Sequence, residues 1–178
     1  MAKDPATEQA QSAATGDGGG PTAGYSPHEH RPLAPYAALS ATFGSALAGA
    51  LVASERSGRK LPEAFSTRDV MLIGVATHKL SRLIAKDKVT AYVRAPFVRY
   101  EGPAGRAEVS EEVRGTGMRR AVGELINCPH CLGQWVAGSF SAGLVAAPRV
   151  TRLIASMLAA QTLSDFLQVA YSAAEERA

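Results

Sequence analysis

Two cysteines separated by two residues form the densest group of reactive side chains in the sequence, in the tetrapeptide Cys128-Pro129-His130-Cys131. Pro129 suits the first position of a helix, because the N–H that proline lacks would have no intrahelical partner there. Cys128 would then lie at the N-cap, where free N–H groups and the helix dipole favour a thiolate. The same spacing allows a disulfide across one helical turn. The motif therefore predicts thiol or metal chemistry at the start of a helix.

Three interpretations of this motif stay open. In a membrane thiol oxidoreductase Cys128 and Cys131 would exchange electrons as a pair, although such enzymes generally carry a second pair and this chain has two cysteines in all. A zinc site would need two further ligands, from His78, His130 or a second chain. In the third interpretation the two thiols only pack the start of a helix. No strand–helix–strand pattern surrounds the motif, which excludes a thioredoxin fold.

Four segments with few charges are predicted to be the helices that position this motif. They are residues 36–54, 69–85, 132–147 and 153–174. The first has no charged residue and reaches the length of a membrane-spanning helix. The second opens with a capping box at Ser66 and Asp69. The fourth carries Asp165, which must face the bundle or water if that helix crosses a bilayer and is therefore a candidate functional residue.

Small residues recur at four-residue spacing within these segments, as in Gly44 with Ala48 and Gly133 with Ala137. In a bilayer such spacing lets a second helix approach closely. We therefore expect an all-α fold, a small multi-pass membrane bundle of three to four helices surrounded by the lipid bilayer. Helix–helix or homo-oligomer contacts would form through the small-residue faces.

Two polar regions precede and interrupt the predicted bundle. Residues 1–35 are rich in glycine and proline and poor in aliphatic side chains, so they are predicted to be a disordered tail. Residues 86–124 form a long polar loop, and residues 105–120 are expected to be its mobile part. The predicted organisation is the tail, a first transmembrane helix at residues 36–54, and a helical membrane domain at residues 69–174.

The charge of the chain is small and mixed in sign. Its 178 residues include 19 Lys and Arg against 16 Asp and Glu, a formal charge of +3, so no nucleic-acid binding is expected. The mean hydropathy of −0.03 is typical of a soluble protein, but it averages polar regions with uncharged helices. Basic residues are more numerous beside the tail and the long loop than at the opposite helix ends. Both termini and the Cys motif are therefore predicted to be cytoplasmic in a cell-membrane protein.

Several short motifs follow one another in a distinctive order. They are Arg82-Leu83-Ile84, Asp87-Lys88-Val89-Thr90, Arg94-Ala95-Pro96-Phe97, Gly123-Glu124-Leu125 and Cys128-Pro129-His130-Cys131-Leu132-Gly133-Gln134-Trp135-Val136-Ala137. Together they resemble the bacterial membrane family catalogued as domain of unknown function 1360, over residues 69–174. The resemblance implies a small multi-pass membrane protein, links some members to sporulation, and supplies no established activity or catalytic residues.

These observations predict an uncharacterised membrane protein with a structural or assembly role in the cell envelope or in spore development, rather than an enzyme. The alternatives are a thiol–disulfide redox protein using Cys128 and Cys131, and a small metal-binding membrane module with zinc on the same thiols. No other cofactor is expected. Asp87, Arg94 and Glu124 are predicted either to form a charged cluster with the Cys motif at the membrane surface, or to act separately, with Asp87 capping a turn and Arg94 meeting lipid phosphates. A polar network that fixes the loop on the bundle would explain these residues without chemistry.

Overall fold

The chain divides into two units, Met1–Arg31 and Pro32–Ala178, and every helix and strand discussed below belongs to the second. The computed structural model describes residues 22, 24–26, 28–29 and 31–177. The predicted disordered tail, residues 1–35, falls mainly outside the described residues. Its last positions, from Leu33 onward, form the first turn of a helix instead.

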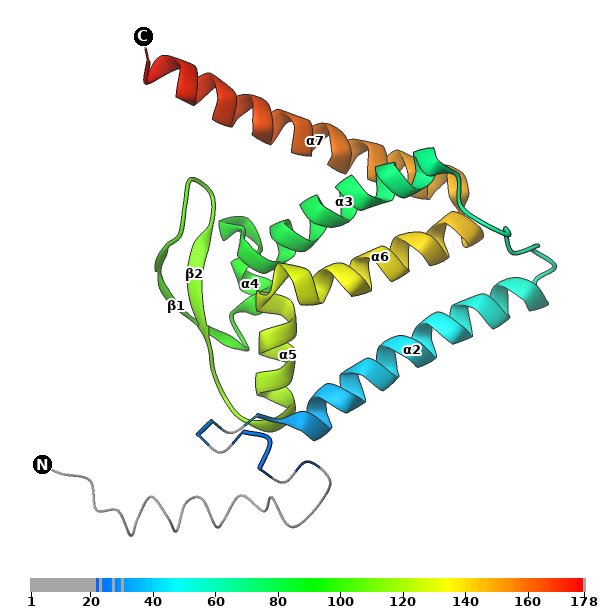
Figure 1. The fold of residues 1–178 in the computed structure, drawn as a ribbon, viewed down its shortest axis with the longest axis horizontal. Helices are drawn as coiled ribbons and strands as arrows, with labels where there is room; N and C mark the ends of the chain where they lie inside the picture. The colour runs from blue at the N-terminus through cyan, green and yellow to red at the C-terminus, as the bar shows by residue number, and fades with distance from the viewer. Residues whose placement is uncertain (1–21, 23, 27, 30, 178) are drawn as a thin grey trace, which may run out of the picture. The chain divides into compact units, whose positions relative to one another are not determined.

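The second unit is mainly helical, as predicted (Figure 1). Its elements are α2 (Leu33–Arg56), α3 (Thr67–Lys86), the 3-10 helix η1 (Lys88–Thr90), α4 (Ala91–Arg94), β1 (Val98–Pro103), β2 (Val109–Val113), α5 (Gly117–Asn127), α6 (Pro129–Ala146) and α7 (Pro148–Glu175). The four long helices α2, α3, α6 and α7 overlap the four predicted segments, and their boundaries differ from the predicted ones by a few residues.

Helix α3 is the centre of the packing, because it contacts both α6 and α7 along its length. The apolar core between these helices consists of Ile73, Ala76, Ala85, Leu132, Val136, Phe140, Leu144, Ala155 and Leu158. Small residues of α6 bring its neighbours close. A Cβ on Gly138 would lie 2.9 Å from Phe43 of α2, and one on Gly143 would lie 2.7 Å from Thr151 of α7. The small-residue spacing of this segment therefore serves helix contacts within the chain.

The start of α3 is capped as its sequence predicts. The Asp69 N–H donates to Ser66 Oγ at 3.1 Å, and the Ser66 hydroxyl donates to the Asp69 carboxylate at 2.9 Å. Arg152 of α7 donates twice to the same carboxylate, at 2.8 and 2.9 Å. This two-pronged contact ties the first turns of α3 and α7 together, because a guanidinium and a carboxylate match in a fork-to-fork geometry.

The four long helices alternate in direction, so the bundle has two distinct ends (Figure 1). The loop from α2 to α3 and the tight α6–α7 connection lie at one end, which we call the turn end. The hairpin β1–β2, the short helices α4 and α5, and the first turn of α6 lie at the other, which we call the hairpin end. The Cys motif and the hairpin consequently share one end of the bundle.

The hairpin corrects the all-α prediction. β1 and β2 pair antiparallel, with Val98 opposite Val113 and Pro103 opposite Val109. Residues 105–120, predicted as the mobile part of a loop, contain β2 and the beginning of α5. Val98 and Val109 bury their side chains, whereas most other strand positions are charged or small. Two short strands with so few apolar residues give a weak alternation, which is why the sequence pattern indicated a loop.

Two of the helices, α2 and α7, are long and apolar enough to cross a membrane by length and composition. Only 6% of the apolar window of α2 and 17% of that of α7 is buried within the chain. The large apolar side chains that α7 leaves exposed are Val150, Leu153, Ile154, Met157, Leu163, Phe166, Leu167, Val169 and Tyr171. Much of the apolar surface of these two helices therefore faces outward.

Candidate functional site

The Cys motif begins α6 as its sequence predicts, with Cys128 at the N-cap and Pro129 in the first turn. The Cys131 N–H donates to Cys128 Sγ at 3.2 Å, and the Cys131 thiol donates to the same sulfur at 2.6 Å. Cys128 is half-buried and Cys131 is exposed, and both are free thiols. Two hydrogen bonds thus converge on the sulfur of Cys128, which is the arrangement that stabilises a thiolate.

The two thiols of this pair differ in acidity. Burial opposes ionisation of Cys128, but hydrogen bonds from the Cys131 thiol and from the N–H groups of Cys131 and His130, with Lys86 nearby, lower its pKa below the ordinary value. Burial raises the pKa of Cys131 to about 11, and the hydrogen bond and charge of Cys128 and the carboxylate of Glu124 add to this. At neutral pH Cys128 is therefore the more reactive thiol.

Alkylation tests this difference. In the reduced chain at neutral pH, iodoacetamide is expected to modify Cys128 before Cys131, because only the thiolate reacts and its fraction is larger where the pKa is lower. Mass spectrometry of briefly treated samples over a pH series would measure both rates, and the Cys131 rate should rise as the pH approaches 11. Cys131 is the more exposed thiol. Preferential modification of Cys131 at neutral pH would mean that exposure, not acidity, controls the reaction.

Arg94 is fully buried and holds the hairpin end together. Its Nε donates to the Glu111 carboxylate at 2.5 Å, and the Glu111 side chain is itself 4% exposed. Its Nη1 donates to the Ile84 carbonyl at 2.6 Å and to Thr90 Oγ1 at 2.9 Å, and its Nη2 donates to the Asp87 carbonyl at 3.0 Å. One guanidinium therefore joins the end of α3, the η1 turn and strand β2.

The three predicted cluster residues do not meet one another through their side chains. Arg94 contacts the backbone of Asp87, and its ionic partner is Glu111. Glu124 accepts from Arg120 at 2.9 Å and from the hydroxyl of Tyr36 on α2. Its carboxylate is nevertheless close enough to raise the pKa of Cys131. Arg94 is fully buried, so the predicted contact with lipid phosphates is wrong; its hydrogen bonds instead join the connecting segment to the end of α3.

A second polar bridge connects this network to the Cys motif. Lys86, in the last turn of α3, donates to the Asn127 side-chain oxygen at 3.1 Å. The Asn127 amide donates in turn to the Glu111 backbone carbonyl at 3.0 Å. Because Asn127 directly precedes Cys128, the same side chain that anchors β2 also positions the start of α6.

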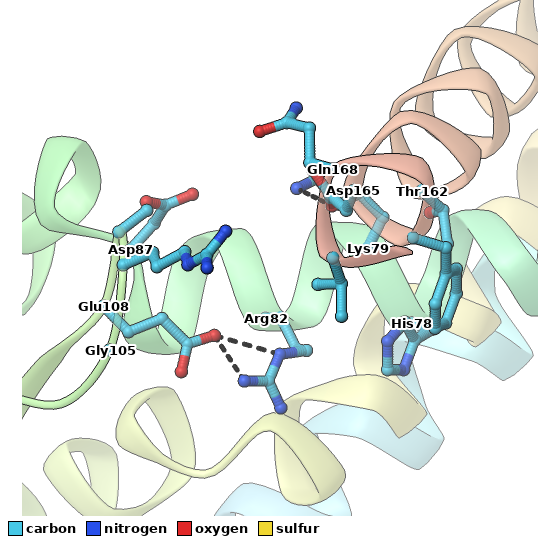
Figure 2. Close-up of a pocket in the computed structure, with 13 residues that line it drawn as sticks. His78, Lys79, Arg82, Asp87, Gly105, Glu108, Thr162, Asp165 and Gln168 are labelled. Carbon is cyan, nitrogen blue, oxygen red and sulfur yellow. Dashed lines mark hydrogen bonds and ion pairs between the residues drawn. The ribbon is translucent and has the colours of Figure 1, made fainter. Parts of the chain in front are cut away.

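Asp165 lies opposite α3 and pairs with Lys79, whose Nζ is 2.6 Å from its carboxylate. The Lys79 side chain is 13% exposed and that of Asp165 is 48% exposed. Both line a cavity of about 700 Å³ between α3, the turn of the hairpin and α7, together with His78, Arg82, Asp87 and Glu108 (Figure 2). Figure 2 shows Arg82 directed at Glu108, with which it forms a second ion pair.

The sequence pattern does not indicate Glu111, Glu108 and Lys79 as partners in these ion pairs. Glu111 and Glu108 lie in the segment that the pattern predicts to be a mobile loop, 17 and 26 residues from their partners Arg94 and Arg82. The available signal is weak: two short runs with few apolar residues lie on either side of Pro103 and Gly105, a spacing that a hairpin can have. For Lys79 the signal is a charge near the middle of a candidate spanning helix, which requires a partner if the helix is embedded.

The predicted metal site has two thiols and no further ligand within the part of the chain that the structure describes. No group of three or more His, Cys, Asp or Glu side chains among those residues could hold a metal ion. A zinc site on Cys128 and Cys131 would therefore need ligands from outside the described residues, as from a second chain.

Comparison with known proteins places this arrangement in a family. Residues 72–171 match the family described as "Protein of unknown function (DUF1360)". The sporulation protein YjcA of Bacillus subtilis (strain 168) is 29% identical over 106 residues, which cover 58% of this chain and 90% of YjcA. No solved structure matches the chain significantly. The family match runs from α3 through the hairpin and the Cys motif into α7. The chain therefore belongs to the DUF1360 family.

Proposed function

We propose that the chain is a multi-pass membrane protein in which α2, α3, α6 and α7 all cross the bilayer. The observation that carries the proposal is the outward apolar surface of α2 and α7. Soluble monomers rarely expose a contiguous apolar patch of more than a few hundred Å². On α7 the exposed fractions of Leu163, Phe166 and Leu167 are 62, 66 and 61%, which suits contact with lipid.

The two inner helices suit the same topology. α3 has 20 residues, which at 1.5 Å per residue makes it about 30 Å long, the thickness of a bilayer core. α6 has 18 residues; its first turn, which holds the Cys motif, would lie at the cytoplasmic surface, and the rest of the helix would cross the bilayer. Besides Lys86 in its last turn, the second half of α3 carries Arg82, which pairs with Glu108, and Lys79, which pairs with Asp165 of α7. Such pairing is how embedded charges are tolerated, so this ion pair supports α3 as a spanning helix.

The hairpin end is the cytoplasmic end in this proposal. Basic side chains concentrate there, in and around the hairpin and the short helices; they include Lys86, Lys88, Arg99, Arg106, Arg114, Arg119 and Arg120. Cytoplasmic loops of membrane proteins carry an excess of Lys and Arg. Both ends of the bundle domain and the Cys motif would then face the cytoplasm, where thiols are normally kept reduced.

A structural or assembly role in the cell envelope or in spore development is the function that these contacts support best. The buried Arg94–Glu111 pair and the Lys79–Asp165 pair both join one element to another. The relative YjcA is named a sporulation protein, and that name motivates a sporulation assay for this chain.

In the native organism, a Cys128→Ser/Cys131→Ser variant is expected to retain function at normal protein level. Complete loss of function at that level would contradict the structural role.

A thiol-redox function is the second candidate, favoured by the 2.6 Å approach of the two sulfurs and their unequal pKa values. The Cys128 thiolate would attack a partner disulfide and release one partner thiolate. Cys131 would lose its proton and displace the second, leaving a Cys128–Cys131 disulfide and a reduced partner. Trapping thiols in cells, with and without reductant, would reveal this disulfide as a gel shift. Thiols that never change state would exclude it.

A metal-binding module is the third candidate and implies oligomerisation. Two copies joined through the exposed small-residue face of α2, which includes Gly44, Ser45 and Ala48, would bring a second chain to the bundle. If that chain also presented Cys128 and Cys131, four thiolates would be available for zinc. Detergent-purified chain would then carry half an equivalent of zinc per protomer, and its absence in a dimeric preparation would exclude this module.

A further inference from the structure

A second cavity, of about 510 Å³, lies between α3 and α6 at the hairpin end. Four basic or titratable side chains line it: His78, Arg82 and Lys86, one turn apart on α3, and His130 of the Cys motif. No carboxylate side chain is among the described residues that line it. The cavity in Figure 2 differs in this respect, because both basic and acidic side chains line it. A concave surface with one sign of charge raises the local concentration of the opposite ion.

The charge of Lys86 is left uncompensated by any carboxylate within the described part of the chain. Its Nζ donates to the neutral side-chain oxygen of Asn127 at 3.1 Å. Arg82 is engaged by Glu108 through Nε and Nη2, which fixes the guanidinium at the mouth of the cavity. The dipole at the start of α6 adds positive potential from the opposite wall. These groups together favour an anion between the two helices.

We propose that this cavity binds a phosphate group, held by the Lys86 ammonium and by Nη1 of Arg82, which Glu108 does not engage. Phosphate oxygens accept hydrogen bonds both from a guanidinium and from an ammonium. The volume is within the range of small-molecule sites, which leaves room for more than the phosphate itself. If the chain spans the bilayer as proposed, the cavity lies at the level of lipid headgroups, so an anionic phospholipid is one source of the group and a soluble phosphate is the other.

Binding by the full-length chain, purified in an uncharged detergent, tests the proposal. The probes are inorganic phosphate and dioctanoyl phosphatidylglycerol, with zwitterionic dioctanoyl phosphatidylcholine for comparison, and affinity is measured from the ligand-dependent rise of the unfolding temperature. Lys86→Gln is expected to weaken binding about tenfold or more, the usual effect of losing one hydrogen bond to a charged group. The matched control is Lys88→Gln, which removes the same charge at an exposed position outside the cavity.

Binding of the phosphatidylglycerol alone identifies a headgroup site, and binding of inorganic phosphate as well identifies a general phosphate site; both support the proposal.

Two results would overturn the phosphate site. One is no binding of either probe, and the other is equal weakening by Lys86→Gln and Lys88→Gln. Inorganic phosphate can bind without a bilayer, so its binding would be observed even if the chain did not span a membrane. The phosphate site and the membrane topology can therefore fail separately.

Discussion

Replacing Glu111 with glutamine is expected to lower the free energy of unfolding by about 3 to 5 kcal/mol, because removing one partner of a buried ion pair leaves the other charge uncompensated. Arg94 is fully buried and Glu111 nearly so, and the charge of the guanidinium would then be opposed only by backbone carbonyls and a hydroxyl. Thermal or chemical unfolding of the detergent-solubilised chain would measure the loss. Limited proteolysis between β1 and β2 would show whether the hairpin opens first.

Glu112→Gln is the matched control for this variant. Glu112 is the next residue on β2 and is exposed, so the same chemical change should alter the stability by no more than about 0.5 kcal/mol. Equal effects of the two substitutions would contradict the central position of Arg94 in the hairpin end. A Glu111→Gln variant as stable as the native chain would do the same.

Replacing Leu163 with lysine is expected to block stable insertion of α7. Leu163 lies near the middle of this helix and is 62% exposed in the isolated chain. In a soluble protein such a surface change costs about 0.5 kcal/mol or less. At the centre of a membrane-spanning helix a lysine costs about 2.5 to 3.5 kcal/mol. The two environments therefore predict different outcomes for the same substitution.

Extraction of membranes with alkaline carbonate measures this effect as the fraction of chain that stays in the pellet. Leu163→Lys should reduce that fraction and the amount of chain in the cell. Glu175→Lys, at the end of the same helix, introduces lysine where the cost approaches zero and serves as the control. If the two variants fractionate alike and accumulate alike, α7 does not lie in the bilayer.

The helices and the start of α6 could be predicted from the sequence because their signals are local. Proline after Cys128 and the Ser66–Asp69 spacing each define a helix start within a few residues, and the structure has both caps. Long stretches with few charges indicated the four long helices in the same way. Such features depend on neighbours along one helix, which spacing alone reveals.

The contacts of the charged residues could not be predicted, because they depend on where a hairpin folds back. Arg94 was recognised as a candidate, but arginine is almost never fully buried, and its partner lies on a strand that the pattern did not indicate. Once β2 is placed beside α4, Glu111 is the carboxylate within reach. The pairing of Lys79 with Asp165 likewise required knowing that α7 packs against α3.

The most direct test of the membrane topology compares the two ends of the bundle in intact cells with a maleimide that cannot cross the membrane. The native Cys128 and Cys131 report the hairpin end, and Glu63→Cys in a Cys128→Ser/Cys131→Ser background reports the exposed loop at the turn end. We predict labelling of the Glu63→Cys variant in intact cells, and labelling of the native pair only after permeabilisation. Labelling of both ends only after permeabilisation would place the whole chain inside the cell and contradict the account.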